Sequence, residues 1–262
     1  MNMTRTGFSN WRLIRCYWLE ARFEFLRLLR TPAFVLPTLL FPSMFYLLFG
    51  VALNGSDAGN TPMSRYMLAT YGTFGVMGVA LFGFGITIAV ERERGFLALK
   101  RALPMPPGAL LFAKTVMAMT FAAIISLMLA AIAAFLAGVS LAPWQWIMLF
   151  VVNILGVIPF AAIGLLIGTC VSGQAAPAVV NLIYLPMSFL SGLWIPLPML
   201  PDYISGIAPV WPSYHLGRVA LAVVGTHGDG VMVHIGILAA VSVACFLLAA
   251  RRLTHLDQIG SG

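Results

Sequence analysis

Two long stretches of the chain carry no charged side chain, and they constrain its fold more than any other feature. No Asp, Glu, Lys or Arg occurs from Tyr66 to Val90, and none occurs between Lys114 and Asp202. Hydrophobic residues make up 61% of the sequence and charged residues 9%, whereas an average soluble domain is about 25% charged. A water-soluble core cannot bury so much apolar surface, so we expect the surrounding solvent to be lipid.

The apolar runs have the length of membrane-spanning helices, which need about 20 mostly apolar residues. Transmembrane β-strands would instead alternate apolar and polar residues over about ten positions, and uninterrupted runs such as Ala118 to Ala137 exclude that pattern. We therefore expect an all-α membrane protein, a single domain over residues 1–262, with six transmembrane helices. Their expected ranges are 32–53, 66–90, 109–138, 143–171, 175–195 and 231–250.

Basic residues concentrate on one side of the expected spans. Six Arg precede the first span, five Lys or Arg lie in or beside the connection between the second and third spans, and Arg251 and Arg252 follow the last one. Only Arg65 and Arg218 fall on the other side. Because Lys and Arg mark cytoplasmic loops, we expect a multi-pass protein of the cytoplasmic (inner) membrane with both termini in the cytoplasm. This placement of charge also argues against nucleic acid as a partner.

Residues 8–30 have the pattern of an amphipathic helix. Apolar residues recur at steps of three or four and share one face, while Arg and Glu occupy much of the opposite arc. We expect this helix to lie in the cytoplasmic interface, with aromatic side chains in the membrane lipid and Arg on anionic headgroups. The alternative is a helix that packs on protein. The apolar face comprises Trp11, Ile14, Trp18, Ala21, Phe25 and Leu29.

The densest cluster of charge lies between the second and third expected spans. Gly95 and the prolines at 104, 106 and 107 indicate a short segment with defined ends, and Phe96, Leu97 and Leu99 give it an apolar ridge. We interpret residues 91–108 as a cytoplasmic docking element for another protein. The alternative is that its basic residues only set topology by reaching lipid headgroups. The cluster comprises Glu91, Arg92, Glu93, Arg94, Lys100 and Arg101.

The last outward connection, Pro196 to Gly230, is long and yet apolar. Irregular backbone at membrane depth is tolerated only against protein or a water-filled cavity. We therefore interpret residues 196–216 as a re-entrant segment that caps the bundle on its outer side. Asp202 and Arg218 in this connection form a candidate ion pair, either as a structural lock or as a substrate contact.

The chemistry that the chain lacks is also informative. It has no His-Glu-x-x-His pattern, no paired carboxylates placed for hydrolysis and no Gly-x-x-x-x-Gly-Lys-Ser/Thr loop for a nucleotide phosphate. We expect neither an enzyme nor a metal centre, no cofactor bound by this chain, and no catalytic residue. Glycines in the second span, and the pair Gly164 and Gly168, are interpreted as helix-packing positions.

Two segments resemble the membrane subunit of ABC type-2 exporters. One runs from Glu91-Arg-Glu-Arg-Gly95 through Leu103-Pro104 to Lys114. The other runs from Phe189-Leu-Ser191-Gly192-Leu-Trp194-Ile-Pro196 through Pro201 to Pro212-Ser-Tyr214. The amphipathic N-terminal helix and the six-span layout also agree, so the resemblance covers essentially the whole chain.

The resemblance implies a mechanism. Two permease subunits, here a homodimer, would each dock on a separate cytoplasmic ATPase that binds ATP and Mg²⁺. ATP-driven closure of the ATPases would open a pathway lined by the first, second and fifth spans. The ATPase-coupling residues would be Glu91, Arg92, Glu93, Arg94, Gly95, Lys100 and Arg101, with Glu91, Glu93 and Arg94 as direct contacts. The outer gate would comprise Ser191, Gly192, Trp194, Pro196 and Pro201, and candidate pathway-lining residues are Phe41, Phe45, Tyr46, Tyr184 and Phe189.

The uncharged spans favour a hydrophobic or amphiphilic cargo, such as a drug-like compound or natural product, over a small ion. Two alternatives remain open on the sequence. One is an exporter of a lipid-linked glycan, and the other is a membrane scaffold or assembly subunit that transports nothing. Docking of an ATPase without ATP-dependent transport would distinguish the scaffold from an exporter.

Overall fold

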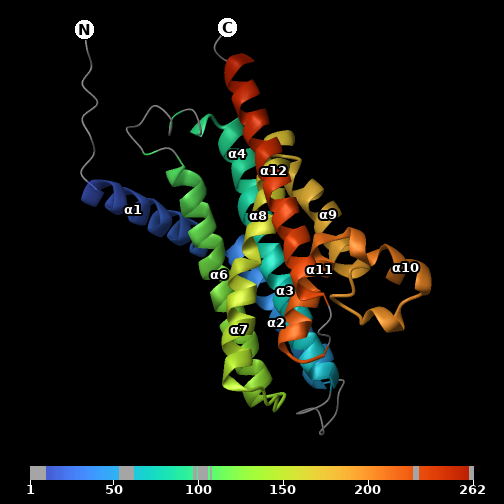
Figure 1. The fold of residues 1–262 in the computed structure, drawn as a ribbon. Helices are drawn as coiled ribbons and strands as arrows, with labels where there is room; N and C mark the ends of the chain where they lie inside the picture. The colour runs from blue at the N-terminus through green and yellow to red at the C-terminus, as the bar shows by residue number, and fades with distance from the viewer. Residues whose placement is uncertain are drawn as a thin grey trace, which may run out of the picture.

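The computed structural model describes residues 10–52, 62–96, 99, 106, 108–226 and 230–259, and this part of the chain is helical with no strand. Helix α1 spans Asn10–Leu29, close to the predicted 8–30. It packs on α6, Ala109–Phe135, and runs at a steep angle to the long helices of the bundle (Figure 1). Trp11, Ile14 and Trp18 are exposed, whereas Ala21 and Leu28 on this helix are buried.

Five helical stretches in the described residues are long and apolar enough to cross a membrane. The first joins α2, Pro32–Phe45, to the π-helical turn η1, Tyr46–Val51. The second joins α3, Pro62–Ala80, through the π-helical turn η4, Leu81–Ile86, to α4, Thr87–Glu93. The other three are α6, the pair formed by α7, Pro143–Leu155, and α8, Val157–Cys170, and finally α12, Val231–Ile259.

Helices α7, Pro143–Leu155, and α8, Val157–Cys170, follow each other with a break at Gly156. Pro159 has no N–H to donate to the carbonyl four residues earlier, so the regular helix cannot continue through this point. Helix α12, Val231–Ile259, packs on α8 and on α11, Pro212–Val223, and most of its membrane-spanning residues are exposed, although Leu238 and Ala249 are buried. The second stretch, α3 to α4, is by contrast the buried centre of the bundle.

The predicted fifth span, 175–195, is not one long helix. Helix α9, Ala176–Leu190, has 15 residues, or about 22 Å at 1.5 Å per residue, which is shorter than a hydrocarbon core of about 30 Å. It ends at a turn where Gly192 has a φ of +76°, in the left-handed region that favours glycine. The described residues thus contain five helical stretches long enough to span a membrane and one shorter apolar helix, and the count of six spans stays a prediction.

The segment after α9 consists of short helices, as the prolines in it predict. These are η5, Leu197–Met199, α10, Asp202–Ile207, and η6, Ala208–Val210, followed by the longer α11, Pro212–Val223. The α10 region projects from the side of the bundle, whereas α11 returns to it and packs on α3, α7 and α12 (Figure 1). A re-entrant position of residues 196–216 in a membrane stays a prediction.

Close approach between η4, α4 and α8 depends on glycine. A Cβ at Gly168 would lie 2.8 Å from Ile88 Cβ and 2.9 Å from the Gly85 carbonyl oxygen. A Cβ at Gly164 would lie 3.1 Å from the Ala80 carbonyl oxygen. The interpretation of Gly164 and Gly168 as packing positions is confirmed, because any larger residue would push α8 away from the helical stretch formed by α3, η4 and α4.

Candidate functional site

A cluster of charged side chains joins α1, α4 and α6 at the end of the bundle where α4 ends. We call Glu24, Arg27, Glu91 and Lys114 the charged cluster. Lys114 Nζ lies 2.6 Å from Glu24 Oε1, 3.1 Å from Glu91 Oε1 and 2.9 Å from Thr87 Oγ1. Arg27 donates to Glu91 at 2.5 Å and to Glu24 at 2.8 Å. Each carboxylate therefore has two cationic partners.

The charged cluster is enclosed at its centre and open on one side. The Lys114 side chain is fully buried, and those of Glu24 and Glu91 are 3% and 5% exposed, whereas Arg27 is 44% exposed. Two carboxylates and two cations balance in charge, which is the condition for keeping such groups out of water. Removing one partner from a buried pair leaves an uncompensated charge and is strongly destabilising. The cluster thus fixes α1 against α4 and α6.

The next two residues attach α4 to the end of α8. Arg92 donates to the carbonyl oxygens of Thr169 and Val171, and Glu93 accepts the backbone N–H of Gly173. Arg252 of α12 also donates to the Thr169 carbonyl, at 3.3 Å. The end of α4 is therefore attached to α1, α6 and α8.

The structure revises how the predicted coupling residues are arranged. Glu91 was predicted as a direct contact for an ATPase, but its carboxylate faces inward and is a buried anchor, because Lys114 and Arg27 supply its counter-charge. Arg94 and Phe96 are exposed, and Gly95 between them has a φ of +74°. Lys100, Arg101 and most of residues 97–107 lie outside the described residues. Contact with an ATPase stays a prediction for this segment.

Sequence reasoning did not find the contributions of Glu24, Arg27 and Thr87. Glu24 was assigned to the polar arc of the N-terminal helix, but it is 4% exposed. Its spacing of three from Arg27 signals a local pair, and an isolated Lys at the start of the third span signals a buried cation that needs an acid. Nothing in the local sequence indicates that the two signals belong together.

Aromatic rings connect α2, α3, α9 and the turn after α9. The ring of Phe45 stacks on Trp194 at 5.6 Å, and Phe74 lies 5.7 Å from Trp194 and 5.0 Å from Tyr184. The ring centroids of Phe189 and Trp194 lie 6.4 Å apart, and those of the half-exposed Phe41 and of Phe45 lie 6.3 Å apart. We call these rings the aromatic cluster: Phe41, Phe45, Phe74, Tyr184, Phe189 and Trp194.

The aromatic cluster brings together four of the five predicted pathway-lining residues. Tyr46 lies apart from it: the side chain is fully buried, and its hydroxyl lies 3.4 Å from the Ser64 carbonyl oxygen. Since Tyr46 faces the interior of its own bundle, the structure gives it a packing position. Phe74, which lies at the centre of the cluster, was missed, because an aromatic residue in a span carries no signal of the direction in which it points.

The predicted outer-gate residues gather around the turn after α9. Ser213 Oγ of α11 donates to Ser191 Oγ at 2.9 Å or to the Met187 carbonyl at 3.0 Å, and Tyr66 Oη of α3 donates to the Gly192 carbonyl at 2.9 Å. Trp194 belongs to the aromatic cluster, and Pro196 is buried. Pro201 is exposed at the start of α10, away from this turn. Gating stays a prediction.

Two histidines form a close pair between α11 and α12. The Nδ1 atoms of His215 and His234 lie 2.7 Å apart, and His215 Nε2 lies 2.9 Å from the Pro209 carbonyl oxygen. Over the described ranges, no group of three or more His, Cys, Asp or Glu gathers to hold a metal ion. This pair is therefore best described as a hydrogen-bonded contact between helices.

Comparisons with known proteins agree with this architecture. Residues 16–224 match the family described as the ABC-2 type transporter. A relative from Bacillus subtilis (strain 168), named "Putative transport permease YvfS", is 29% identical over 197 residues, which cover 75% of this chain and 80% of the relative. The match extends from α1 through α11 and includes the charged cluster, the aromatic cluster and the turn after α9. The chain belongs to the ABC-2 type transporter family and is a multi-pass membrane permease subunit of an ABC transporter.

Proposed function

We propose that this permease exports a hydrophobic or amphiphilic compound, drug-like or a natural product, from the cytoplasm across the inner membrane. A separate cytoplasmic ATPase binds ATP and Mg²⁺ and drives the movement, as the family implies by its partner ATP-binding subunit. Two copies of the chain pair around the pathway. In this proposal the end of the bundle formed by α1 and α4 faces the cytoplasm, because most Lys and Arg lie there.

The observation that carries the proposal is the attachment of α4 to three other helices at that end. A force applied to residues 91–108 reaches α1 and α6 through the charged cluster. It reaches α8 through the hydrogen bonds of Arg92 and Glu93. Because buried ion pairs do not stretch gradually, these helices move as a unit or the cluster breaks. Such an arrangement suits a membrane subunit that receives its energy from another chain.

The aromatic cluster supports an apolar cargo. It follows α2, α3 and α9 with no charged side chain among its members, and Phe41 extends it to the exposed face of α2. Aromatic rings provide large, rigid contact surfaces for apolar and amphiphilic molecules. With a second copy facing α2 and α9, these rings would line one side of a shared pathway. The π-helical turns η1 and η4 lie on the same helices, and such turns are frequent at functional sites.

The test is co-purification followed by transport. The tagged full-length chain is purified from its native membrane in mild detergent, together with any stoichiometric ATPase, and reconstituted into proteoliposomes. We expect vanadate-sensitive ATP hydrolysis and ATP-dependent movement of an uncharged fluorescent hydrophobic dye. Movement of a fluorescent lipid-linked glycan instead of the dye would show that the substrate is a lipid-linked glycan rather than a drug-like compound. A chain that purifies with an ATPase but moves neither probe would favour the scaffold alternative.

A further inference from the structure

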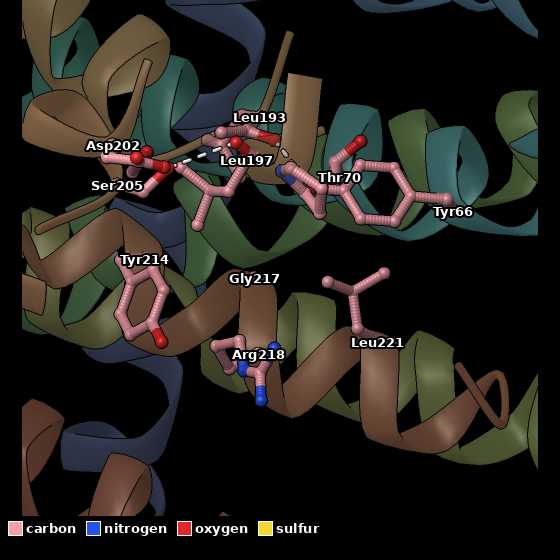
Figure 2. A pocket seen from close by; sticks show the side chains of 13 residues that line it. Tyr66, Thr70, Leu193, Leu197, Asp202, Ser205, Tyr214, Gly217, Arg218 and Leu221 are labelled. Atoms are coloured by element: carbon pink, nitrogen blue, oxygen red, sulfur yellow. Dashed lines mark hydrogen bonds between the residues drawn. The ribbon is translucent and has the colours of Figure 1, made fainter. Parts of the chain in front are cut away.

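A cavity of about 340 Å³ lies between α3, the turn after α9, α10 and α11 (Figure 2). Two hydrogen bonds hold its walls: Tyr66 Oη donates to the Gly192 carbonyl at 2.9 Å, and Ser205 Oγ donates to the Leu197 carbonyl at 3.0 Å. Pockets for small ligands begin at about 300 Å³. The space therefore accepts a molecule or group of headgroup size.

Two opposite charges face this cavity without neutralising each other. Arg218 of α11 and Asp202 of α10 both line it, and Figure 2 shows them on different sides of the space. Throughout the described part of the chain, neither has an ion-pair partner within 4.0 Å, so the predicted Asp202–Arg218 bridge does not form. The guanidinium lies 6.0 Å above the ring of Tyr214, which orients it.

The half-buried guanidinium of Arg218 has the chemistry of an anion site. A cation beside apolar surface is stabilised by a counter-charge, and the planar guanidinium matches the oxygens of phosphate with two parallel hydrogen bonds. Asp202, at the start of α10, supplies an acceptor for a cationic group. The complementary ligand therefore carries a phosphate and an ammonium group in one compact unit.

The surroundings favour a lipid as the source of that unit. Large apolar side chains on the same segment are strongly exposed: Met199 is 64%, Tyr203 73% and Val210 77% exposed. Acyl chains extending from a headgroup in the cavity would cover such side chains. A soluble zwitterion would leave them bare.

We propose that this cavity binds the headgroup of a zwitterionic phospholipid of the phosphoethanolamine type. The phosphate lies on Arg218 and the ammonium on Asp202, while the acyl chains remain in the bilayer beside α10. The bound lipid would connect α10 and α11 to α3 and stabilise the segment that follows α9. The proposal requires the chain to be in a membrane but does not depend on which compound is transported.

The experiment is native mass spectrometry of the purified full-length chain in detergent. The probes are dioleoyl-phosphatidylethanolamine, dioleoyl-phosphatidylglycerol, dioleoylglycerol and soluble phosphoethanolamine. The variants are Arg218→Gln, Arg218→Lys and Asp202→Asn. Arg65→Gln is the matched control, because it removes an Arg that bonds the Ser140 carbonyl and does not line the cavity.

We expect phosphatidylethanolamine to bind more tightly than the other three probes. Arg218→Gln should weaken it by about tenfold or more, as loss of a charge-assisted contact implies. The affinity of Arg218→Lys for phosphatidylethanolamine should lie between those of Arg218→Gln and the wild type. Asp202→Asn should abolish the preference for phosphatidylethanolamine over phosphatidylglycerol. Arg65→Gln should leave the affinity unchanged.

Three results would overturn the proposal. They are dioleoylglycerol binding as tightly as phosphatidylethanolamine, soluble phosphoethanolamine binding as tightly as the lipid, and equal lipid binding by Arg218→Gln and Arg65→Gln. Thermal unfolding of each variant in the same detergent shows that binding is compared between folded proteins. Failure of dye transport in the proteoliposome test leaves these lipid-binding results unaffected, so the two proposals fail separately.

Discussion

The ammonium nitrogen of Lys114, on α6, lies 2.6 Å from Oε1 of Glu24, on α1, although 90 positions separate the two residues. Both side chains are enclosed, at 0% and 3% exposed. The same ammonium lies 3.1 Å from Glu91 Oε1 of α4, so one side chain connects three helices at the end of the bundle where α4 ends. This contact and the Arg27–Glu91 pair together join α1 to α4 and α6.

Replacing Lys114 with Met should strongly destabilise the chain. Glu24 and Glu91 would then share only Arg27, which leaves one excess negative charge in an enclosed site, and breaking a buried pair in this way costs about 3–5 kcal/mol. The measurement is thermal unfolding in detergent. The double variant Glu24→Gln/Lys114→Met restores the charge balance and should recover part of the loss. A loss no larger than that of Arg94→Met, which removes an exposed cation, would contradict the importance of the cluster.

Reversing the charge of Arg94 should uncouple the permease from its ATPase without unfolding it. Arg94 and Phe96 are exposed at the end of α4, and exposed substitutions usually change stability by less than about 0.5 kcal/mol. We expect Arg94→Glu and Phe96→Ala to lower co-purification of the ATPase and vanadate-sensitive hydrolysis, with unchanged thermal unfolding. Glu93→Arg would not separate docking from stability, because Glu93 also accepts a hydrogen bond from the Gly173 N–H. Undiminished ATPase association in both variants would remove residues 94–96 from the docking surface.

Gly168→Ala should destabilise the bundle, whereas Gly236→Ala should not. The added methyl group at position 168 would meet Ile88 and the Gly85 backbone at under 3 Å, while nothing lies within 4 Å of a Cβ at position 236. Overpacking costs about 1–3 kcal/mol, and Gly to Ala at an open helical site gains about 0.5–1 kcal/mol. Comparing the two melting temperatures in one detergent tests this difference, and equal values would show that α8 can move away from η4 at no cost.

The sequence predicts those parts of the fold that depend on local hydropathy. It does not predict those that depend on contacts between residues far apart in the chain. The limits of α1 and of most spans are predicted within a few residues, because apolar run length is a local property. The early end of α9 is not predicted, because no charged residue interrupts the chain between Leu190 and Trp194. The turn is evident only from the positive φ of Gly192. The same holds for the charged cluster. Glu24 is buried in a pair with Lys114, and no local sequence pattern predicts that pair.

Trp194→Phe should leave the aromatic cluster stable, whereas Trp194→Ala should not. Phe retains a ring against Phe45 and Phe74 and removes the indole N–H, which is buried and has no hydrogen-bond partner over the described residues. An unsatisfied buried donor costs about 1–3 kcal/mol. Ala removes both ring pairs, worth about 0.5–1.5 kcal/mol each beyond buried area. Thermal unfolding provides the measurement, with the exposed Trp144→Phe as control. A large loss in Trp194→Phe would mean that the N–H has a partner.

The histidine pair predicts a pH dependence, because its hydrogen bonds assign the protons. The Pro209 carbonyl only accepts, so His215 donates from Nε2 and His234 donates from Nδ1 to the unprotonated Nδ1 of His215. Tyr214 packs edge-on against both rings, and Arg218 is the charged group near His234. A second proton on His215 would place two N–H groups against each other.

Stability should therefore fall as the pH is lowered below about 6.5, the ordinary pKa of histidine. Burial lowers the pKa of His215, and the hydrogen bond to Pro209 only partly opposes this effect. The unfolded chain then takes up its proton at a higher pH than the folded chain, so the stability present above the unfolded pKa is lost as the pH falls through the folded one. We expect a lower melting temperature at about pH 5.5 than at about pH 7.5, and a smaller difference in His215→Gln. Equal pH dependence of the two proteins would place the titrating group elsewhere.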